Sequence, residues 1–281
     1  MPAQRLPAAL EAEWGCDPEW LAQLPRLAAE CAAEWGLSLE SPYDTPHSLV
    51  VPAGEVVLKL NAPAHFEADH EADALIAWAG QGAARLVARD EARRALLIER
   101  CRPGTPLRGS GLDEPAVVVE LLTKLAVTPE PHPFRTVADE AERWEAEVIG
   151  RYEGEPFERS LLAQAVEVFR GADRAAGSLV NQDLHSDNIL RAERAPWLVI
   201  DPKPLVGEPE VNGVGLLRNA AGGGGGARAV RRWLDVLGQL GLDRERLRGW
   251  GVAHALAWGW DERGGWSGRS IEIARSIAAA G

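Results

Sequence analysis

The sequence predicts an α+β protein of two lobes: a small N-terminal lobe with an antiparallel sheet and a helix, and a larger, mostly helical C-terminal lobe. Short β-branched runs predominate between residues 37 and 99, whereas helical spacing of apolar residues predominates after residue 106. The stretch 101–106, rich in proline and glycine, separates the two textures. We therefore expect lobes at 1–100 and 101–281, and a chain of 281 residues is long enough for a core in each.

The N-terminal lobe is expected to carry a helical extension, residues 1–36, ahead of its sheet. Apolar residues recur at helical spacing from Pro18 to Trp35, and Asp17 is a candidate N-cap. Pro25 is expected to kink this helix or to divide it in two. The runs that follow predict a β-hairpin of 48–51 and 55–60, a helix at 64–79, and two more strands at 84–88 and 94–99.

The C-terminal lobe is expected to be helical apart from one polar segment. The candidate helices are 113–127, 137–151, 158–176, 227–241, 243–260 and 267–279. The exception is 179–201, where a polar loop is followed by a short strand, a turn and a second strand from Trp197 to Ile200. Five consecutive glycines, Gly222 to Gly226, are expected to interrupt the helices and form a flexible connector, because each costs about 1 kcal/mol relative to alanine in a helix.

Composition excludes several classes of partner. The formal net charge of −12 argues against nucleic acid, because an acidic surface repels phosphate backbones. That charge would suit a polycationic ligand, although many proteins are acidic for solubility alone. Cys16, Cys31 and Cys101 are far apart and predict neither a disulfide framework nor a zinc site, which fits a cytoplasmic protein. We expect no secretory signal and no membrane contact, since no apolar stretch could span a bilayer.

The segment 181–201 carries the densest polar chemistry of the chain. Asn188 follows Asp183 by five residues, and Asp201 ends the second of the two strands that come next. This order of aspartate, asparagine, short hairpin and second aspartate is typical of kinase-type phosphoryl transfer. Because Mg²⁺ prefers carboxylate and amide oxygens, Asn188 and Asp201 are candidate metal ligands. Asp183 would orient a substrate hydroxyl and accept its proton.

Two other interpretations compete for this segment. His185 with Asp183 and Asp187 is compatible with a metal hydrolase, but the sequence has no second histidine cluster to complete such a site. Alternatively, these aspartates and asparagines only form turns, which they favour in any protein. The strand and the second aspartate that follow favour phosphoryl transfer over both.

The segment LVNQDLHSDNILRAERAPWLVIDPKPLVGEPE resembles the aminoglycoside and hydroxyurea resistance kinases, in particular the streptomycin 6-phosphotransferase group. Supporting segments are VVLKL, HEADALIAW, ALLIERCRPGTPL, FRTVADEAERW and DRERLRGWGVAHALAW, so the resemblance covers most of the chain. It implies the protein-kinase-like bilobal fold of aminoglycoside phosphotransferases, with ATP and Mg²⁺ as cofactors. It also implies that Asp183 is the catalytic base and that Asn188 and Asp201 bind the metal.

The same resemblance implies a nucleotide site in the N-terminal lobe. Lys59 is similar to the lysine that holds the α- and β-phosphates, and Glu71 to its ion-pair partner, although Glu67 competes for that role. The apolar residues around Lys59 predict a half-buried ammonium, which needs a partner. The carbonyl of Glu99 and the amide of Cys101 are expected to receive the adenine.

Three positions depart from the pattern of related kinases. No glycine-rich phosphate loop is present between residues 44 and 48, so Ser48 or His47 would have to donate to the phosphates. Asn181 stands where the wider kinase class often has histidine. Asn212 stands where related sequences have an aspartate that braces the catalytic loop. These departures leave open a degenerate protein that binds nucleotide with little turnover.

The acceptor pocket is expected in the helical lobe beside Asp183. Side chains there that suit a cationic amino-cyclitol antibiotic are Trp144, Glu145, Trp258, Trp260, Asp261, Glu262 and Trp266. Asp261 and Glu262 are the candidate substrate residues, whereas most of the 11 tryptophans are expected to pack in the core. The expected activity is phosphorylation of streptomycin or a related aminoglycoside by a monomer or homodimer. A kinase of another small metabolite is the alternative.

Overall fold

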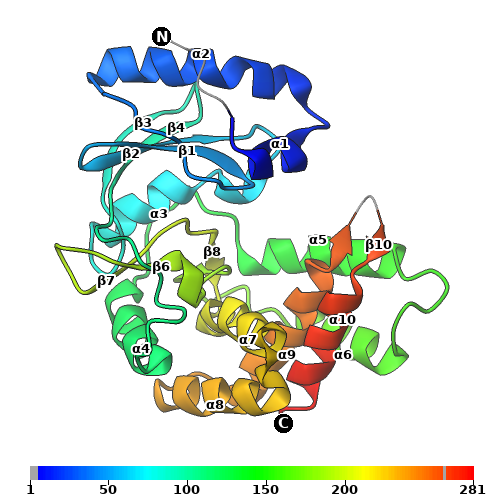
Figure 1. Cartoon of the computed structure of the whole chain (residues 1–281). Helices are drawn as coiled ribbons and strands as arrows, with labels where there is room; N and C mark the ends of the chain where they lie inside the picture. Colours follow the sequence, from blue (N-terminus) through cyan, green and yellow to red (C-terminus); the bar gives the residue numbers. More distant parts are fainter. Residues whose placement is uncertain (1–5, 262–263) are drawn as a thin grey trace. The chain divides into compact units, whose positions relative to one another are not determined.

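The computed structural model of the protein describes residues 6–261 and 264–281. The chain divides into two compact units: unit 1 is Met1–Thr105 with Leu190–Asp201, and unit 2 is Pro106–Ile189 with Pro202–Gly281. Unit 1 contains the small sheet and unit 2 most of the helices, so the predicted α+β class is confirmed (Figure 1). The segment 190–201 belongs to unit 1, although it lies beyond the predicted boundary near residue 100.

The sheet of unit 1 has four antiparallel strands in the order β1-β2-β4-β3. They are β1 (Ser48–Ala53), β2 (Val56–Asn61), β3 (Leu86–Asp90) and β4 (Ala95–Glu99). The predicted hairpin is confirmed, because β1 pairs with β2 across Gly54, whose φ of +65° suits the turn. The second pair of predicted strands, β3 and β4, is also confirmed.

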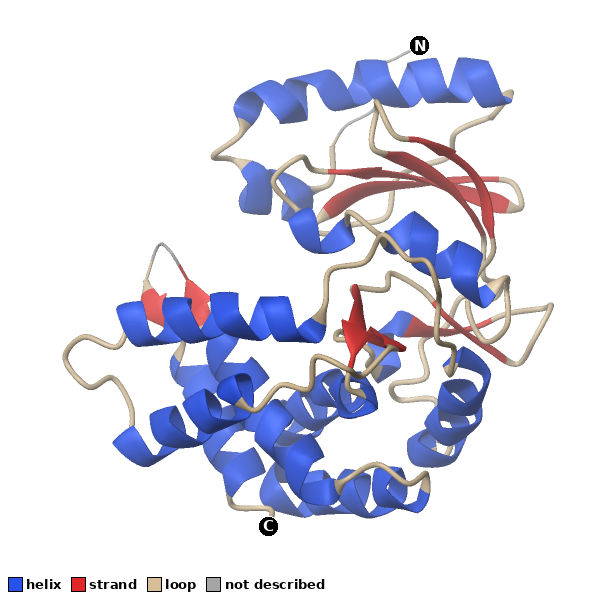
Figure 2. Ribbon diagram, turned by 180° about the vertical axis from the view of Figure 1, so that it is seen from behind, coloured by secondary structure: helices blue, strands red, loops and turns tan. Residues whose placement is uncertain are grey.

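Helices cover both faces of this sheet. Helix α2 (Pro18–Trp35) lies along one face and α3 (Glu71–Trp78) along the other (Figures 1 and 2). Since side chains alternate along a strand, Leu58 and Leu60 of β2 join the core beneath α2, whereas Lys59 points to the face of α3. Strand alternation therefore delivers Lys59 to the helix that carries its expected partner.

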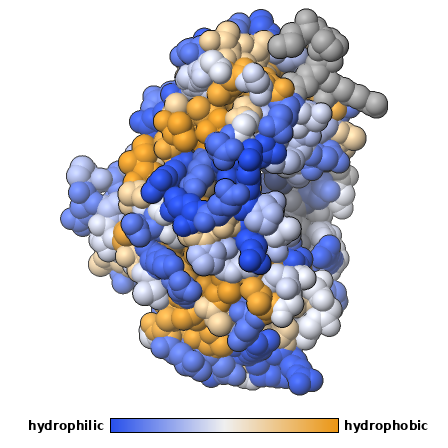
Figure 3. All heavy atoms as spheres, turned by 60° about the vertical axis from the view of Figure 1, so that its left-hand side comes forward, coloured by the Kyte–Doolittle hydropathy of each residue, from blue (hydrophilic) through white to orange (hydrophobic). Residues whose placement is uncertain are grey.

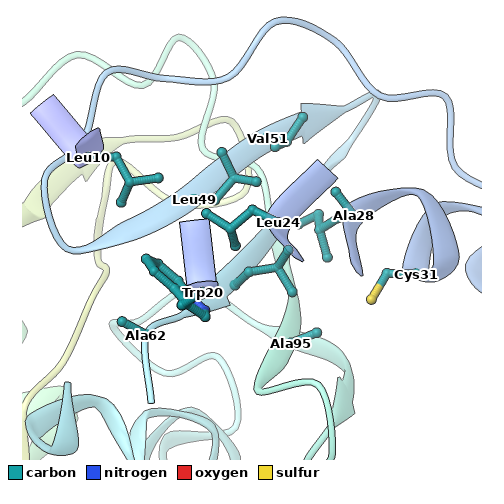
Figure 4. Close-up of a cluster of buried hydrophobic side chains, with 11 residues drawn as sticks. Leu10, Trp20, Leu24, Ala28, Cys31, Leu49, Val51, Ala62 and Ala95 are labelled. Atoms are coloured by element: carbon teal, nitrogen blue, oxygen red, sulfur yellow. The ribbon is translucent and has the colours of Figure 1, made fainter. Parts of the chain in front are cut away.

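The core of unit 1 explains why α2 is one helix. Its residues Trp20, Leu24, Ala28 and Cys31 recur every three or four positions and are all buried (Figure 4). Asp17 caps the helix, since its Oδ1 accepts a hydrogen bond from Trp20 N at 3.0 Å. Pro25 lies inside the helix without dividing it, so the expectation of two helices was wrong. Burial of the apolar stripe outweighs the proline, which costs about 3 kcal/mol in a helix.

The predicted helix at 64–79 is shorter in the structure. A 3-10 turn at Phe66–Ala68 precedes α3, which begins only at Glu71. A further helix that the sequence did not predict, α1 (Ala8–Trp14), precedes α2 and contributes Leu10 to the same core.

Unit 2 consists mainly of helices. They are α4 (Glu114–Leu125), α5 (Val137–Gly150), α6 (Arg159–Arg170), α7 (Val214–Ala220), α8 (Gly226–Gln239), α9 (Arg244–Ala257) and α10 (Gly268–Ala278). All but α7 were predicted. Trp144, Phe169 and Trp250 form an aromatic centre from α5, α6 and α9, with ring centroids 6.2–6.5 Å apart.

The glycine run connects α7 to α8. Residues Ala221–Gly225 form a π-helical turn, in which Gly224 has φ +86° and interrupts the helical path. The expected break is therefore present at Gly224, while the residues before it continue the helix instead of leaving it. Glycine makes this path accessible because it has no Cβ to oppose positive φ.

Short strands complete the structure. The pairs are β5 (Ser178–Asn181) with β8 (Pro204–Gly207), β6 (Ile189–Arg191) with β7 (Trp197–Val199), and β9 (Trp260–Asp261) with β10 (Gly265–Trp266). Within the described residues, no helix combines the length and the apolar character needed to cross a membrane. On the face drawn in Figure 3, hydrophilic and apolar residues are interspersed.

The core beneath α2 gives a test of the fold. Replacing the fully buried Leu24 by alanine should lower the free energy of unfolding by about 2–5 kcal/mol, because it leaves a cavity. Urea unfolding followed by circular dichroism would measure the change. The control, Ile76→Ala on the exposed side of α3, should stay within about 0.5 kcal/mol of the parent protein. Equal effects of the two variants would contradict the packing described for α2.

Candidate active site

Lys59 is the centre of a buried ionic cluster in unit 1. Its Nζ lies 2.7 Å from Glu71 Oε2 and 2.6 Å from Asp201 Oδ1. Lys59 and Glu71 are almost fully buried, whereas the Asp201 side chain is 31% exposed. Burial disfavours the charged ammonium, but the two carboxylates outweigh that effect and raise the pKa of Lys59 above its ordinary value. The partner is Glu71 and not Glu67, whose carboxylate lies 4.0 Å from His65.

Asp201 has an unusual backbone conformation for a residue other than glycine. Its φ is +50°, in the left-handed region that aspartate tolerates better than most residues. Such conformations persist where the surrounding structure fixes them, and they cluster at functional sites. The conformation turns the chain directly after β7, where the carboxylate meets Lys59.

Asn61 extends the cluster and was not predicted from the sequence. Its Oδ1 accepts a hydrogen bond from Ser48 Oγ at 2.6 Å, and its Nδ2 donates to Glu71 Oε2 at 3.3 Å. The signal was available, because Asn61 lies two residues after Lys59 and therefore on the same face of β2. Ser48 is buried in this network, and its contact with a phosphate stays a prediction.

Glu99 and Cys101 lie at the end of β4. The Glu99 carboxylate binds the guanidinium of Arg194 through two hydrogen bonds of 2.8 Å and accepts a third from Arg85 N at 3.0 Å. Although burial opposes it, this bonding lowers the pKa of Glu99. Burial raises the pKa of the Cys101 thiol to about 11, so the thiol stays protonated at neutral pH. Binding of adenine by the main chain at Glu99 and Cys101 stays a prediction.

In unit 2 the polar loop that follows β5, residues 182–188, is held by asparagine side chains. Asn181 Oδ1 accepts hydrogen bonds from Asp183 N at 3.1 Å and from Lys203 N at 3.0 Å. Asn212 Oδ1 in turn accepts one from Asn181 N at 2.9 Å. Asn181 and Asn212, the two departures noted in the sequence, thus both hold the main chain of the loop through their amide oxygens.

Asp183 and Asn188 occupy the two ends of this loop. Asn188 Nδ2 donates to the carbonyl of Asp183 at 3.3 Å, which leaves its amide oxygen as the atom able to bind a metal. The Asp183 carboxylate has cationic or titratable groups on both sides: Arg218 Nη1 lies 3.8 Å from Oδ1, and His185 Nε2 lies 3.7 Å from Oδ2. The loop therefore fixes the main chain while the carboxylate stays at the surface of unit 2.

Arg218 belongs to a further network that sequence patterns did not reveal. Its guanidinium lies over the ring of Trp258, 4.8 Å from the centroid, and 3.4 Å from His254 Nδ1. His254 Nε2 is 3.3 Å from Gln182 Oε1. Burial and the nearby Arg218 lower the pKa of His254 well below its ordinary value, so this histidine is neutral. A neutral ring accepts from Arg218 and donates to Gln182, the neighbour of Asp183.

A cavity of about 570 Å³ opens beside Asp183 in unit 2. This volume suits a small-molecule ligand. Its polar lining includes Asp183, His185, Asp187, Arg108, Arg218 and Arg269, and its wall also includes Gly222 and Gly223. Arg108 Nε binds both oxygens of Asp187, at 2.6 and 2.7 Å. The described wall carries side chains of both signs of charge, whereas the acceptor candidates named from the sequence were acidic or aromatic.

The predicted acceptor residues have varied placements. Asp261, in β9, is exposed and does not line this cavity, and Glu262 lies outside the described residues. Trp144 is in the core, and Glu145 binds Arg170 at 2.6 Å. The remaining tryptophans also pack against protein groups, Trp258 against Arg218 and His254, and Trp260 against Trp266. A substrate role for Asp261 and Glu262 stays a prediction.

Each of the two predicted metal ligands, taken by itself, carries a donor that suits Mg²⁺ better than a transition metal. Asn188 and Asp201 offer an amide and a carboxylate oxygen, which hard cations prefer. Across residues 6–261 and 264–281, no group of three or more histidine, cysteine, aspartate or glutamate side chains is arranged to hold a metal ion. The hydrolase interpretation needs such a group, because zinc sites use several nitrogen or sulfur ligands.

The arrangement of the small antiparallel sheet and the helices is that of the protein-kinase-like fold. The fold agrees with that of choline kinase LicA from Streptococcus pneumoniae, which is 12% identical, with a TM-score of 0.67 over 92% of this chain and 99% of that one. Residues 40–265 match the aminoglycoside/hydroxyurea antibiotic resistance kinases, and the chain belongs to this family. The resemblance seen in the sequence is therefore confirmed.

Two relatives share about a third of their residues with this chain. Streptomycin 6-kinase from Streptomyces griseus is 35% identical over 84% of this chain and 82% of its own length. Hydroxyurea phosphotransferase from Kitasatospora aureofaciens is 34% identical over 91% of this chain and 78% of its own length. The protein is accordingly an enzyme, a kinase that transfers a phosphoryl group to a hydroxyl.

Gly215 gives a test of how the loop is held. A Cβ at this position in α7 would lie 2.5 Å from the carbonyl oxygen of Leu184, next to Asp183. Gly215→Ala should therefore displace the catalytic loop and lower kcat about tenfold or more, since small misplacements of reacting groups are costly. Steady-state kinetics would measure it. Gly150→Ala, where nothing lies within 4 Å, is the matched control, and an equal kcat for both variants would contradict the contact.

Proposed function

We propose that the protein transfers the γ-phosphoryl group of ATP to a hydroxyl of a small-molecule antibiotic, and that streptomycin or a related aminoglycoside is the first acceptor to test. The observation that carries the proposal is the position of Asp183. Its main chain is fixed by Asn181 and Asn188, and its carboxylate lines a cavity of ligand size. The family and the names of the relatives support the choice of acceptor.

In the proposed reaction, Asp183 accepts the proton of the acceptor hydroxyl. The acceptor oxygen forms a bond to the γ-phosphorus while the bond from that phosphorus to the β,γ-bridging oxygen breaks, and ADP leaves. Positioning and electrostatics supply most of the acceleration in such a transfer. Lys59, held by Glu71, is the proposed cation for the α- and β-phosphates. The main chain at Glu99 and Cys101 is proposed to receive the adenine.

Asn188 and Asp201 are the proposed ligands of Mg²⁺. When bound, the ion would neutralise the charge that develops on the transferred phosphoryl group. The carboxylate of Asp201 also lies 2.6 Å from Lys59 Nζ. The proposed metal ligand and the proposed phosphate-binding cation are therefore direct neighbours in unit 1.

Hydroxyurea is a second candidate acceptor, and the charge of the cavity favours it. Arg108, Arg218 and Arg269 line the wall, and one of the two aspartates there is already paired with Arg108. A polycationic acceptor would meet these arginines, whereas a neutral one would not be repelled. The hydroxyurea phosphotransferase among the relatives supports the same candidate.

A coupled assay of ADP release with a panel of acceptors tests the proposal. The panel would contain streptomycin, other aminoglycosides and hydroxyurea, with ATP and Mg²⁺ in excess. Acceptor-dependent ADP release is expected, and mass spectrometry would identify the phosphorylated product. Asp183→Asn should lower kcat by about 10²–10⁴-fold, the usual contribution of a general base, while ATP binding stays within about twofold.

The matched control is Asp235→Asn, which removes an exposed carboxylate paired with Arg244 and should leave kcat unchanged. Turnover retained by Asp183→Asn would contradict its assignment as the base. Binding of MgATP without turnover of any acceptor would instead support the degenerate, nucleotide-binding alternative. Turnover restricted to acceptors outside the antibiotics would identify a metabolite kinase.

Asp201 can be tested separately through its metal. Asp201→Asn keeps an oxygen but removes the charge, so the Mg²⁺ concentration that half-saturates ATP binding should rise about tenfold or more. Titration of Mg²⁺ at fixed ATP, followed with a fluorescent nucleotide, would measure it. Asp69→Asn, which removes a surface carboxylate paired with Arg94, is the control. Identical titrations for Asp201→Asn and the parent protein would show that Asp201 is not a ligand.

A further inference from the structure

The Arg194 side chain is the centre of a hydrogen-bond network, and all of its partners belong to unit 1. It lies in the turn between β6 and β7, within the segment Leu190–Asp201 that follows the polar loop and belongs to unit 1. Its three guanidinium nitrogens make four hydrogen bonds. Two go to the carboxylate of Glu99 at 2.8 Å, one to the carbonyl of Gly80 at 2.8 Å, and one to the carbonyl of Ala83 at 2.9 Å.

The first of these partners connects Arg194 to the end of β4. Glu99 is the last residue of that strand, and its carboxylate also accepts from Arg85 N, while Glu99 N donates to Arg85 O at 2.8 Å. Both the carboxylate and the main-chain N–H of Glu99 are therefore held, and together they set the position of the chain from Glu99 to Cys101. A planar guanidinium that binds a carboxylate in two places fixes orientation as well as distance.

The second set of partners connects Arg194 to β7, the strand that ends two residues before Asp201. Gly80 and Ala83 belong to the loop between α3 and β3, and β7 pairs with the same loop through its main chain. Val199 N donates to Gly82 O, and Ala84 N donates to Val199 O, both at 2.9 Å. The loop 80–84 thus holds the hairpin at Arg194 and again at Val199, two residues before Asp201.

Arg194 is also sheltered enough for these bonds to matter. Its side chain is 25% exposed and that of Glu99 is 19% exposed, so solvent screens this pair less than an exposed ion pair. The hydrogen bonds to Glu99 are the main reason that the pKa of Arg194 is raised above its ordinary value. Neither residue contacts Lys59, so the contribution of Arg194 to that cluster is indirect.

We propose that Arg194 is a positioning residue for the nucleotide: its guanidinium joins the chain at Glu99–Cys101, where adenine is proposed to bind, to β7, the strand that ends two residues before Asp201, the proposed metal ligand. The inference rests on the proposed function, whose nucleotide site it deepens. It has a specific consequence. Because one side chain holds both parts, its loss weakens recognition of the base and of the metal together, and leaves the acceptor site in unit 2 unaffected.

Equilibrium binding to the full chain tests this without relying on turnover. Two quantities would be measured at a temperature where every variant is folded: the dissociation constant of adenosine without metal, and the Mg²⁺ concentration that half-saturates ATP binding. Arg194→Gln should raise both by about fivefold to tenfold, since it loses a bidentate charged contact. Arg194→Lys should give an intermediate change, because lysine cannot reproduce the planar fork.

The matched control is Arg93→Gln. Arg93 is also in unit 1, its side chain is 29% exposed, and it binds carboxylates of Asp90, Glu30 and Glu34. It lies on neither segment that Arg194 joins, so both quantities should stay within about twofold of the parent protein. The thermal midpoints of the variants, measured alongside, separate general loss of stability from loss of positioning.

The outcomes are distinct. Unchanged adenosine and Mg²⁺ binding in Arg194→Gln, or equal shifts in Arg93→Gln, would overturn the inference and leave the proposed function intact. A rise in only one of the two quantities would also overturn it, because the proposed role couples them. If the parent protein itself shows no Mg²⁺-dependent binding of ATP, the proposed function fails and the inference fails with it.

Discussion

The buried ammonium of Lys59 is the interaction on which unit 1 depends. An isolated charge in a protein interior is strongly unfavourable, and removal of one partner from a buried pair typically costs about 3–5 kcal/mol. Glu71 is 12 residues away in the sequence and Asp201 is 142 residues away. The sheet, α3 and the hairpin of β6 and β7 must therefore come together before Lys59 is satisfied. The same requirement brings the proposed phosphate-binding lysine next to the proposed metal ligand Asp201.

In unit 2 the main constraint is that an irregular loop, residues 182–188, is held in one conformation. A loop without regular pairing must find other partners for its buried main-chain groups. Asn181 and Asn212 provide them, and their side-chain oxygens accept three main-chain hydrogen bonds between them. Close contact with Gly215 of α7 holds the loop from the other side. Asp183 can thus present a fixed carboxylate to the cavity although no helix or strand carries it.

Local patterns predicted most elements but not all. The hairpin of β1 and β2 and the helices α5, α8, α9 and α10 follow from alternation or helical periodicity. Helix α7 was missed because it has only seven residues. So short a segment does not show a clear apolar stripe at helical spacing. Strands β5 and β8 were missed because they pair across the polar loop. Pro25 does not divide α2 in two, because the free energy that proline costs inside a helix is smaller than that gained by burying the apolar stripe of a continuous helix.

The sequence by itself determined which chemical groups the candidate site offers: a carboxylate at 183, an amide at 188 and a carboxylate at 201, at spacings typical of phosphoryl transfer. Residue type and local spacing are enough for that conclusion, since both are properties of a short segment. Only the tertiary structure decided the partners of the candidate site residues: Asn61 beside Glu71, Arg218 beside Asp183, and Arg194 beside Glu99. Such partners are set by packing between segments that are distant in the chain, and no local pattern of residues records it.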